Sequence, residues 1–183
     1  MPDVTLPAGL STAPLLADIS STQTITTGVY RVNKIALSGG NTLTISGNVQ
    51  LYVQQTMSLS GTGMILLQSS SKLEMYHAGK IDSSGSGVIN QSGIPINCKL
   101  YGLPTCTDIS MSGSSALYAY VYAPSADVKI TGGGADYNGM IQANSITSSG
   151  SGVFHYDESI GGSSRPTIGP WQEYRWNGTD WTP

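Results

Sequence analysis

Six carboxylates and two histidines are the side chains of this sequence that could support catalysis. They are spread from residue 77 to residue 158: Asp82, Asp108, Asp127, Asp136, Asp157, Glu158, His77 and His155. Acid–base catalysis needs such groups to converge, and a zinc site needs several ligands at short spacing. The two histidines are instead far apart in the sequence, and Asp is a common turn residue because it bonds nearby backbone N–H groups. We therefore expect no catalytic residue, no metal ligand and no cofactor.

An aromatic strip is the other candidate for function. Every second residue of one short run is tyrosine: Tyr118, Tyr120 and Tyr122. Alternate residues of a strand share one face, so a strip facing solvent could stack on sugars or contact a protein partner. Val128 and Ile130 indicate that even-numbered residues face inward after the corner at Pro124. If the same holds before the corner, the tyrosine strip faces inward instead. A corner can reset parity, so both alternatives stay open.

The elements that would position these residues are short strands. One phrase recurs: an apolar residue, any residue, an apolar residue, Ser or Thr, then Gly, with copies starting at Ile35, Leu43, Met57, Ile109, Val128 and, in degenerate form, Ile146. Alternation of apolar and polar residues is the strand period, and Gly suits tight corners. The last three copies follow one another at nearly constant spacing. This spacing predicts an all-β chain folded as a right-handed parallel β-helix (a β-solenoid) with coils of about 14–19 residues.

The sequence divides into three parts. We expect an extended segment over residues 1–27, the solenoid over 28–160 with an insertion at 90–107, and a tail over 161–183. The tail carries a tryptophan at every fifth position: Trp171, Trp176 and Trp181. Something must cover the exposed apolar core at the end of a solenoid. We expect these tryptophans to form a C-terminal cap, with contact to another domain or subunit as the alternative.

The two cysteines lie in the expected insertion. Cys98 and Cys106 are close together in a loop that contains Gly and Pro. A loop of this size closes readily, and a disulfide there would contribute roughly 2–3 kcal/mol. Disulfides are typical of exported proteins. We therefore expect a disulfide that clips the insertion, with two unpaired thiols as the alternative.

Composition excludes several classes of partner. Charged residues make up 10% of the chain and the net charge is −3, against roughly 25% charged residues in ordinary domains. Eight Lys and Arg residues over the whole chain do not form the basic patch that nucleic-acid binding requires. No apolar run is long enough for a transmembrane helix, and the N-terminus lacks a signal-peptide pattern. The low charge indicates an extracellular protein.

The stretch from Ala116 to Ile160 resembles a known pattern. Its elements are Ala-Pro-Ser-Ala-Asp at residues 123–127, Gly-Met-Ile-Gln-Ala-Asn-Ser at 139–145, and Phe-His-Tyr-Asp-Glu at 154–158. These are similar to the C-terminal β-helical domain of PilX-type pilus-assembly and related bacterial surface proteins, and to adhesin-like Ala-Pro-x-Ala β-helix domains. The resemblance implies a surface or pilus-associated role without catalytic residues. PilX-type proteins begin with an apolar prepilin-like helix, which this sequence lacks.

Three functional hypotheses follow. The first is a non-enzymatic structural or adhesive module on a bacterial cell surface or pilus, with other surface subunits and polysaccharide as partners. The second is a carbohydrate- or ice-binding surface; Thr42 and Thr44 begin the Thr array that ice binding needs, but Ser58 does not continue it. The third is a polysaccharide-active β-helix enzyme. Any attachment to a membrane would use a segment outside this sequence.

Overall fold

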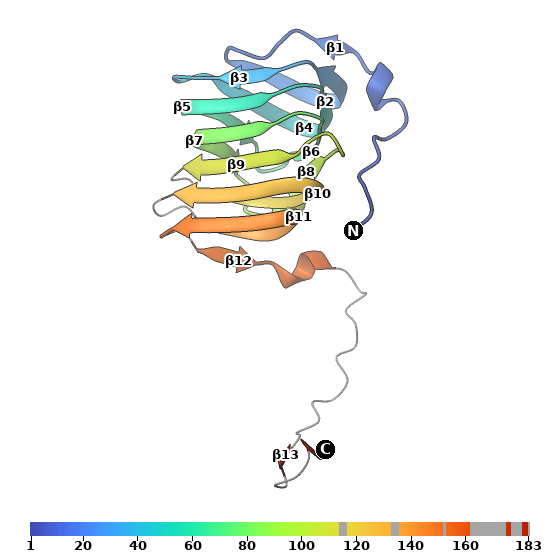
Figure 1. The fold of residues 1–183 in the computed structure, drawn as a ribbon. Coiled ribbons are helices and arrows are strands. Elements are labelled where there is room, and N and C mark those ends of the chain that lie inside the picture. Colours follow the sequence, from blue (N-terminus) through green and yellow to red (C-terminus); the bar gives the residue numbers. More distant parts are fainter. Residues whose placement is uncertain (114–116, 133–135, 152, 162–174, 177–180, 183) are drawn as a thin grey trace.

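The protein is a right-handed parallel β-solenoid of about six turns (Figure 1). This computed structural model describes residues 1–113, 117–132, 136–151, 153–161, 175–176 and 181–182. Helical structure in this part of the chain is limited to three short 3-10 turns: Leu10–Thr12, Pro95–Asn97 and Glu158–Gly161. No helix there is long and apolar enough to cross a membrane. The predicted fold class is confirmed.

The strands form three faces, which we name A, B and C. Face A stacks β1 (Leu15–Leu16), the second half of β2 (Gln23–Val32), the second half of β4 (Thr42–Val53), β6 (Lys72–His77), β8 (Cys98–Gly102), the first halves of β10 (Leu117–Gly132) and β11 (Tyr137–Gly150), and β12 (Phe154–Tyr156). Face B stacks β3 (Ile35–Leu37), the first halves of β5 (Met57–Leu67) and β7 (Ile81–Asn90), β9 (Asp108–Gly113), and the second halves of β10 and β11. Among the described residues, face C contains the first halves of β2 and β4 and the second halves of β5 and β7.

The recurring sequence phrase marks face B. The first residues of five copies form one column in register, which also includes Ile81: Ile35, Met57, Ile81, Ile109, Val128 and Ile146. The copy that begins at Ile81 escapes detection because Ser83 stands at its second apolar position. The copy that begins at Leu43 belongs to face C. The same sequence phrase therefore occurs in strands of two different faces.

The coils are mostly longer than the sequence spacing predicts. In the lower part of the solenoid, Ile109 pairs with Val128 and Val128 with Ile146, so these coils have the expected length. The coil from Met57 to its register partner Ile81 is longer, because the upper coils include a third wall, face C. The expectation came from the lower coils, which lack that wall.

The segment 90–107 does not leave the coil as a whole. Cys98–Gly102 is strand β8, which pairs with β6 on one side and β10 on the other. Its even-numbered positions face inward, in register with the inward residues Leu73 and Val121 of the neighbouring strands, so the run satisfies the strand period. Upstream, β2 begins at Gln23, and Ile19 is fully buried against the first coil.

The corner between faces A and B depends on glycine at position 79. A Cβ built on Gly79 would collide with the backbone carbonyl of Gln55 in the coil above. That carbonyl belongs to the backbone of a paired coil and cannot rotate away as a side chain could. The adjacent coils therefore approach closely only because residue 79 has no side chain.

We expect Gly79→Ala to lower the free energy of unfolding by about 1–3 kcal/mol, the usual cost of overpacking. Gly40→Ala is the matched control, because a Cβ on Gly40 meets nothing within 4 Å. Denaturant unfolding of both variants measures the difference. Equal stability of the two would contradict the proposed close approach.

Candidate functional site

The tyrosine strip of β10 faces outward. Between its members lie Ala119 and Val121, which are buried, while Tyr118, Tyr120 and Tyr122 are partly exposed. The register of β10 with β11 shifts between Ala123 and Asp127, and Val128 is then buried. At the corner at Pro124, the inward-facing positions therefore change from odd-numbered to even-numbered residues. The tyrosines before the corner face outward, which decides between the two alternatives that the sequence left open.

The strip continues upward through the coils of face A. Tyr122 is in register with Tyr101, Tyr101 with Tyr76, and Tyr76 with Tyr52. We call these four residues and Tyr120 the tyrosine ladder. The rings of Tyr76 and Tyr101 are stacked with centroids 4.9 Å apart, and Tyr101 meets Tyr120 edge to face at 6.0 Å. Aromatic pairs of this geometry add roughly 0.5–1.5 kcal/mol beyond their burial, so the ladder joins adjacent coils.

A polar column runs beside the ladder on the same face. Gln50, Glu74 and Lys99 follow one another in register. The carboxylate of Glu74 accepts a hydrogen bond from Gln50 at 3.0 Å and an ion-paired hydrogen bond from Lys99 at 3.0 Å. Burial opposes ionisation of Glu74, but the hydrogen bonds from Lys99 and Gln50 outweigh it and lower the pKa of this carboxyl. Face A therefore presents a fixed negative and a fixed positive group next to phenol rings.

Tyr76, Tyr101 and Tyr120 are held as neutral hydrogen-bonding groups. Burial, followed by the nearby charge of Glu74, raises the pKa of Tyr101 to about 12. Burial also raises the pKa of Tyr76 and of Tyr120. Tyr76 is buried and Tyr101 is partly exposed. Because their rings cover each other's faces, the pair leaves less free ring surface for stacking on sugars.

The N-terminal segment contacts this face. The Tyr122 hydroxyl donates a 2.6 Å hydrogen bond to the Pro2 carbonyl, and Arg31 Nε donates to the Ala13 carbonyl at 2.8 Å. Residues 1–13 thus extend past the outside of several coils, from the level of β10 to that of β2. Part of face A is covered by the chain itself.

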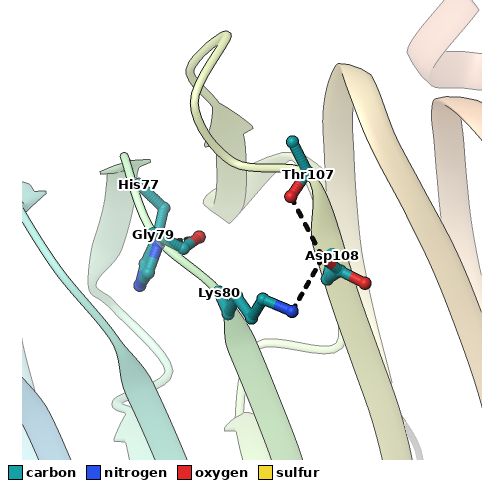
Figure 2. A network of polar contacts seen from close by, with 5 residues as sticks. All are labelled: His77, Gly79, Lys80, Thr107 and Asp108. Atoms are coloured by element: carbon teal, nitrogen blue, oxygen red, sulfur yellow. Dashed lines mark hydrogen bonds and ion pairs between the residues drawn. The ribbon is translucent and has the colours of Figure 1, made fainter.

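Three of the six candidate carboxylates serve as turn and pairing residues. Asp127 accepts hydrogen bonds from Asn144 and Ser145, and Asp136 accepts one from the backbone N–H of Val153. Figure 2 shows Asp108 at the corner between faces A and B, where it pairs with Lys80 at 3.1 Å and accepts a hydrogen bond from Thr107. These contacts are the backbone and surface roles expected of such residues.

Within the described residues, no three His, Cys, Asp or Glu side chains lie close enough to hold a metal ion. His77 is fully buried at the end of β6, whereas His155 is exposed on β12. The structure therefore does not bring the two histidines together.

His77 is buried as a neutral ring. Its Nδ1 lies 3.0 Å from the Gly79 carbonyl (Figure 2), and because a carbonyl only accepts, Nδ1 carries the proton. Nε2 has no hydrogen-bond partner among the described residues. Burial lowers the pKa of His77 to about 4, with the Gly79 hydrogen bond as a weaker opposing effect. Neither composition nor spacing indicates this burial, which follows from the inward register of His77 with Val53.

The expected disulfide is wrong. Cys98 and Cys106 are both free and both buried. Cys98 points inward from β8, below Leu73, and Cys106 packs over Gly102. Each thiol therefore fills the apolar core as a small hydrophobic side chain. Burial raises the pKa of Cys98 to about 12, and burial with the nearby Asp108 raises that of Cys106 to about 11.

Most of the tryptophan tail, including Trp171, lies outside the described residues. Trp176 and Trp181 are register partners in two short antiparallel strands, β13 (Arg175–Trp176) and β14 (Trp181–Thr182). The expected cap over the solenoid therefore stays a prediction.

Comparison with protein families identifies the family to which the chain belongs. The family described as Domain of unknown function (DUF7305) matches residues 10–162, more than half of the sequence. The chain belongs to this family. The DUF7305 match spans the coils from the first 3-10 turn to the last one. No curated protein and no solved structure matches the chain.

We expect both thiols of the native DUF7305 domain to resist modification. At pH 8, thiol groups with pKa values of about 12 and 11 hold little reactive thiolate. A thiol reagent such as DTNB should label neither cysteine in the native protein and both in guanidinium without reductant. A protein two hydrogens lighter that stays unlabelled in guanidinium would show a disulfide instead.

We also expect His77 to make stability depend on pH. Its pKa is lower in the folded protein, at about 4, than the 6.5 of an unfolded chain, so the unfolded state binds the proton first. Stability is then complete above about pH 6.5 and falls by about 3 kcal/mol as the pH drops to 4. Denaturant unfolding between pH 7 and 4 should show a shallower decline for His77→Leu than for the parent protein. The exposed control, His155→Gln, should follow the parent, and parallel curves for His77→Leu and the parent would contradict the assignment.

Proposed function

We propose that this protein is a non-enzymatic structural or adhesive module of a bacterial surface or pilus-associated protein, located outside the cell. The observation that supports this proposal best is the outward tyrosine ladder. Aromatic, amide, carboxylate and ammonium groups follow one another coil by coil on a stiff β-scaffold. The resemblance to PilX-type β-helical domains at residues 123–127 and 139–145 points the same way.

Face A suits a protein partner better than a sugar chain. Interfaces between proteins are enriched in tyrosine, and edge-presented phenols with neighbouring charged groups can form several directed hydrogen bonds. A sugar ring would need a free aromatic face, and Tyr76 and Tyr101 cover one another. We therefore propose other surface or pilus subunits as the main partners, with polysaccharide as the alternative. Weak contacts of this kind gain strength when many copies are linked in an array.

The proposed contact surface can be tested with exposed ladder residues. We expect Tyr120→Ser and Tyr122→Ser together to weaken self-association, or retention on a polysaccharide panel, by at least about tenfold, which corresponds to roughly 1.4 kcal/mol. Sedimentation and affinity electrophoresis measure the two activities. Ser58→Ala on face B is the control, and thermal melting separates lost contacts from lost folding.

Two results would refute the proposal. The first is unchanged association and retention in the tyrosine double variant. The second is release of polysaccharide fragments by the parent protein that is abolished by Asp108→Asn or Asp127→Asn, which would support the polysaccharide-active enzyme instead.

A further inference from the structure

In the part of the chain that the structure describes, β7 is the last strand of face C, while the other two faces continue. Below Gln23 of β2, its inward column consists of Leu43, Ile65 and Val88, in register. Leu43 and Ile65 are fully buried, but Val88 is partly exposed. The next inward column ends on Asn90, whose side-chain amide donates hydrogen bonds to the carbonyls of Ile94 and Tyr118. This polar residue turns the chain away from the face-C stack.

The inward side chains of face B also become more exposed in the lower coils. One inward column begins with Leu37 and Leu59, which are 1% and 0% exposed. Continuing downward, Ser83, Met111 and Ile130 are partly exposed, although they keep the same register. Exposure therefore increases at the level where face C stops, so the lower coils carry an apolar groove along the missing wall.

Chain length explains the missing wall. Ten residues connect Gly61 on face B to Lys72 on face A, and they include the face-C strand of β5. Only three residues connect Gly113 to Leu117 lower in the stack. Three residues span at most about 10 Å, which is too short to build a strand across a face.

The groove contains a cavity of about 100 Å³. Its lining is mostly apolar and includes Met75, Val88, Met111, Val121 and Ile130, with Ser83 at the position that leucine fills in the coil above. Residues 87–90 of β7 pair on one edge with β5. On the other edge no described strand pairs with them, and the backbone carbonyl of Asn90 accepts a hydrogen bond from Gly93 at 3.1 Å. The site thus combines an open strand edge with room for an apolar side chain.

We propose that this groove accepts a β-strand donated by a separate polypeptide chain. A strand would satisfy the edge of β7 with backbone hydrogen bonds and would place a branched apolar side chain below Val88, as strand addition does elsewhere. The inward residues of this column, Leu43 and Ile65, define the side chain that fits. A cavity of this size is smaller than the roughly 300–1000 Å³ of small-molecule pockets, which favours a side chain over a free ligand. The surface is separate from the tyrosine ladder on face A.

A peptide taken from the protein itself is a suitable probe. Residues 41–47, Asn-Thr-Leu-Thr-Ile-Ser-Gly, form the face-C strand of β4 and pair with the next strand through the same geometry. We expect this peptide, labelled with a fluorophore, to bind saturably to the full chain and to slow amide hydrogen exchange at Val88 and Asn90, whose N–H groups point away from β5. The control peptide carries Ser in place of Leu43 and Ile45 and should bind at least tenfold more weakly.

Variants of the full chain locate the site. Ser83→Leu fills the cavity with the residue found at position 59 and should weaken peptide binding at least tenfold. Ser38→Leu, the same change at an exposed position in the first coils, should leave binding unchanged. If Ser83→Leu does not fold, Val88→Lys places a charge at the partly exposed mouth and should have the same effect.

Three results would overturn the inference. The peptide could fail to bind, or it could bind equally to the parent protein and to Ser83→Leu or Val88→Lys. Slow exchange of the Val88 and Asn90 amides in the free protein would show that this chain already covers the edge itself.

Discussion

The stacking of identical backbone positions, about 4.8 Å apart from coil to coil, is the constraint on which this structure depends. A side chain that faces inward in one coil must fit against its register partners directly above and below. The column of Ile35, Met57 and Ile81 satisfies this condition with apolar groups of similar size. The outward column of Tyr52, Tyr76 and Tyr101 satisfies it with aromatic rings. Core and surface are therefore organised by the same repeat.

The stacking rule also explains what happens where the repeat changes. The described strands form three walls in the upper coils and two in the lower coils, because the connections from face B to face A shorten after β9. Residues such as Val88 and Met111 keep their inward register but lose part of their cover. A change in loop length thus creates an apolar groove without any change in the strands themselves.

Buried polar groups occupy inward columns under the same rule. His77 takes a position that is Val53 in the coil above, and Cys98 takes one that is Leu73. Both side chains are held in their neutral forms because burial disfavours charge. In this environment they contribute to packing, and the chemical reactivity that their types suggest is suppressed.

Local sequence pattern by itself determined the β-solenoid, the strand positions on face B, and the length of the last coils. These features depend on alternation and corner glycines within a few residues of one another, so they can be read from Ile109 to Gly150 directly. Segment boundaries follow less directly from the pattern. Pro95, Pro104 and the cysteines interrupt it, so the sequence predicts an insertion where β8 continues the solenoid.

Only the tertiary structure decided the outward direction of Tyr118, Tyr120 and Tyr122 and the free state of Cys98 and Cys106. Each of these depends on which residue of another coil lies above or below, a full coil away in the sequence. The corner at Pro124 moves the inward positions from odd to even residues, and such a shift exchanges the inner and outer faces of a strand. Local pattern does not contain that shift, because the packing of the adjacent coils selects it.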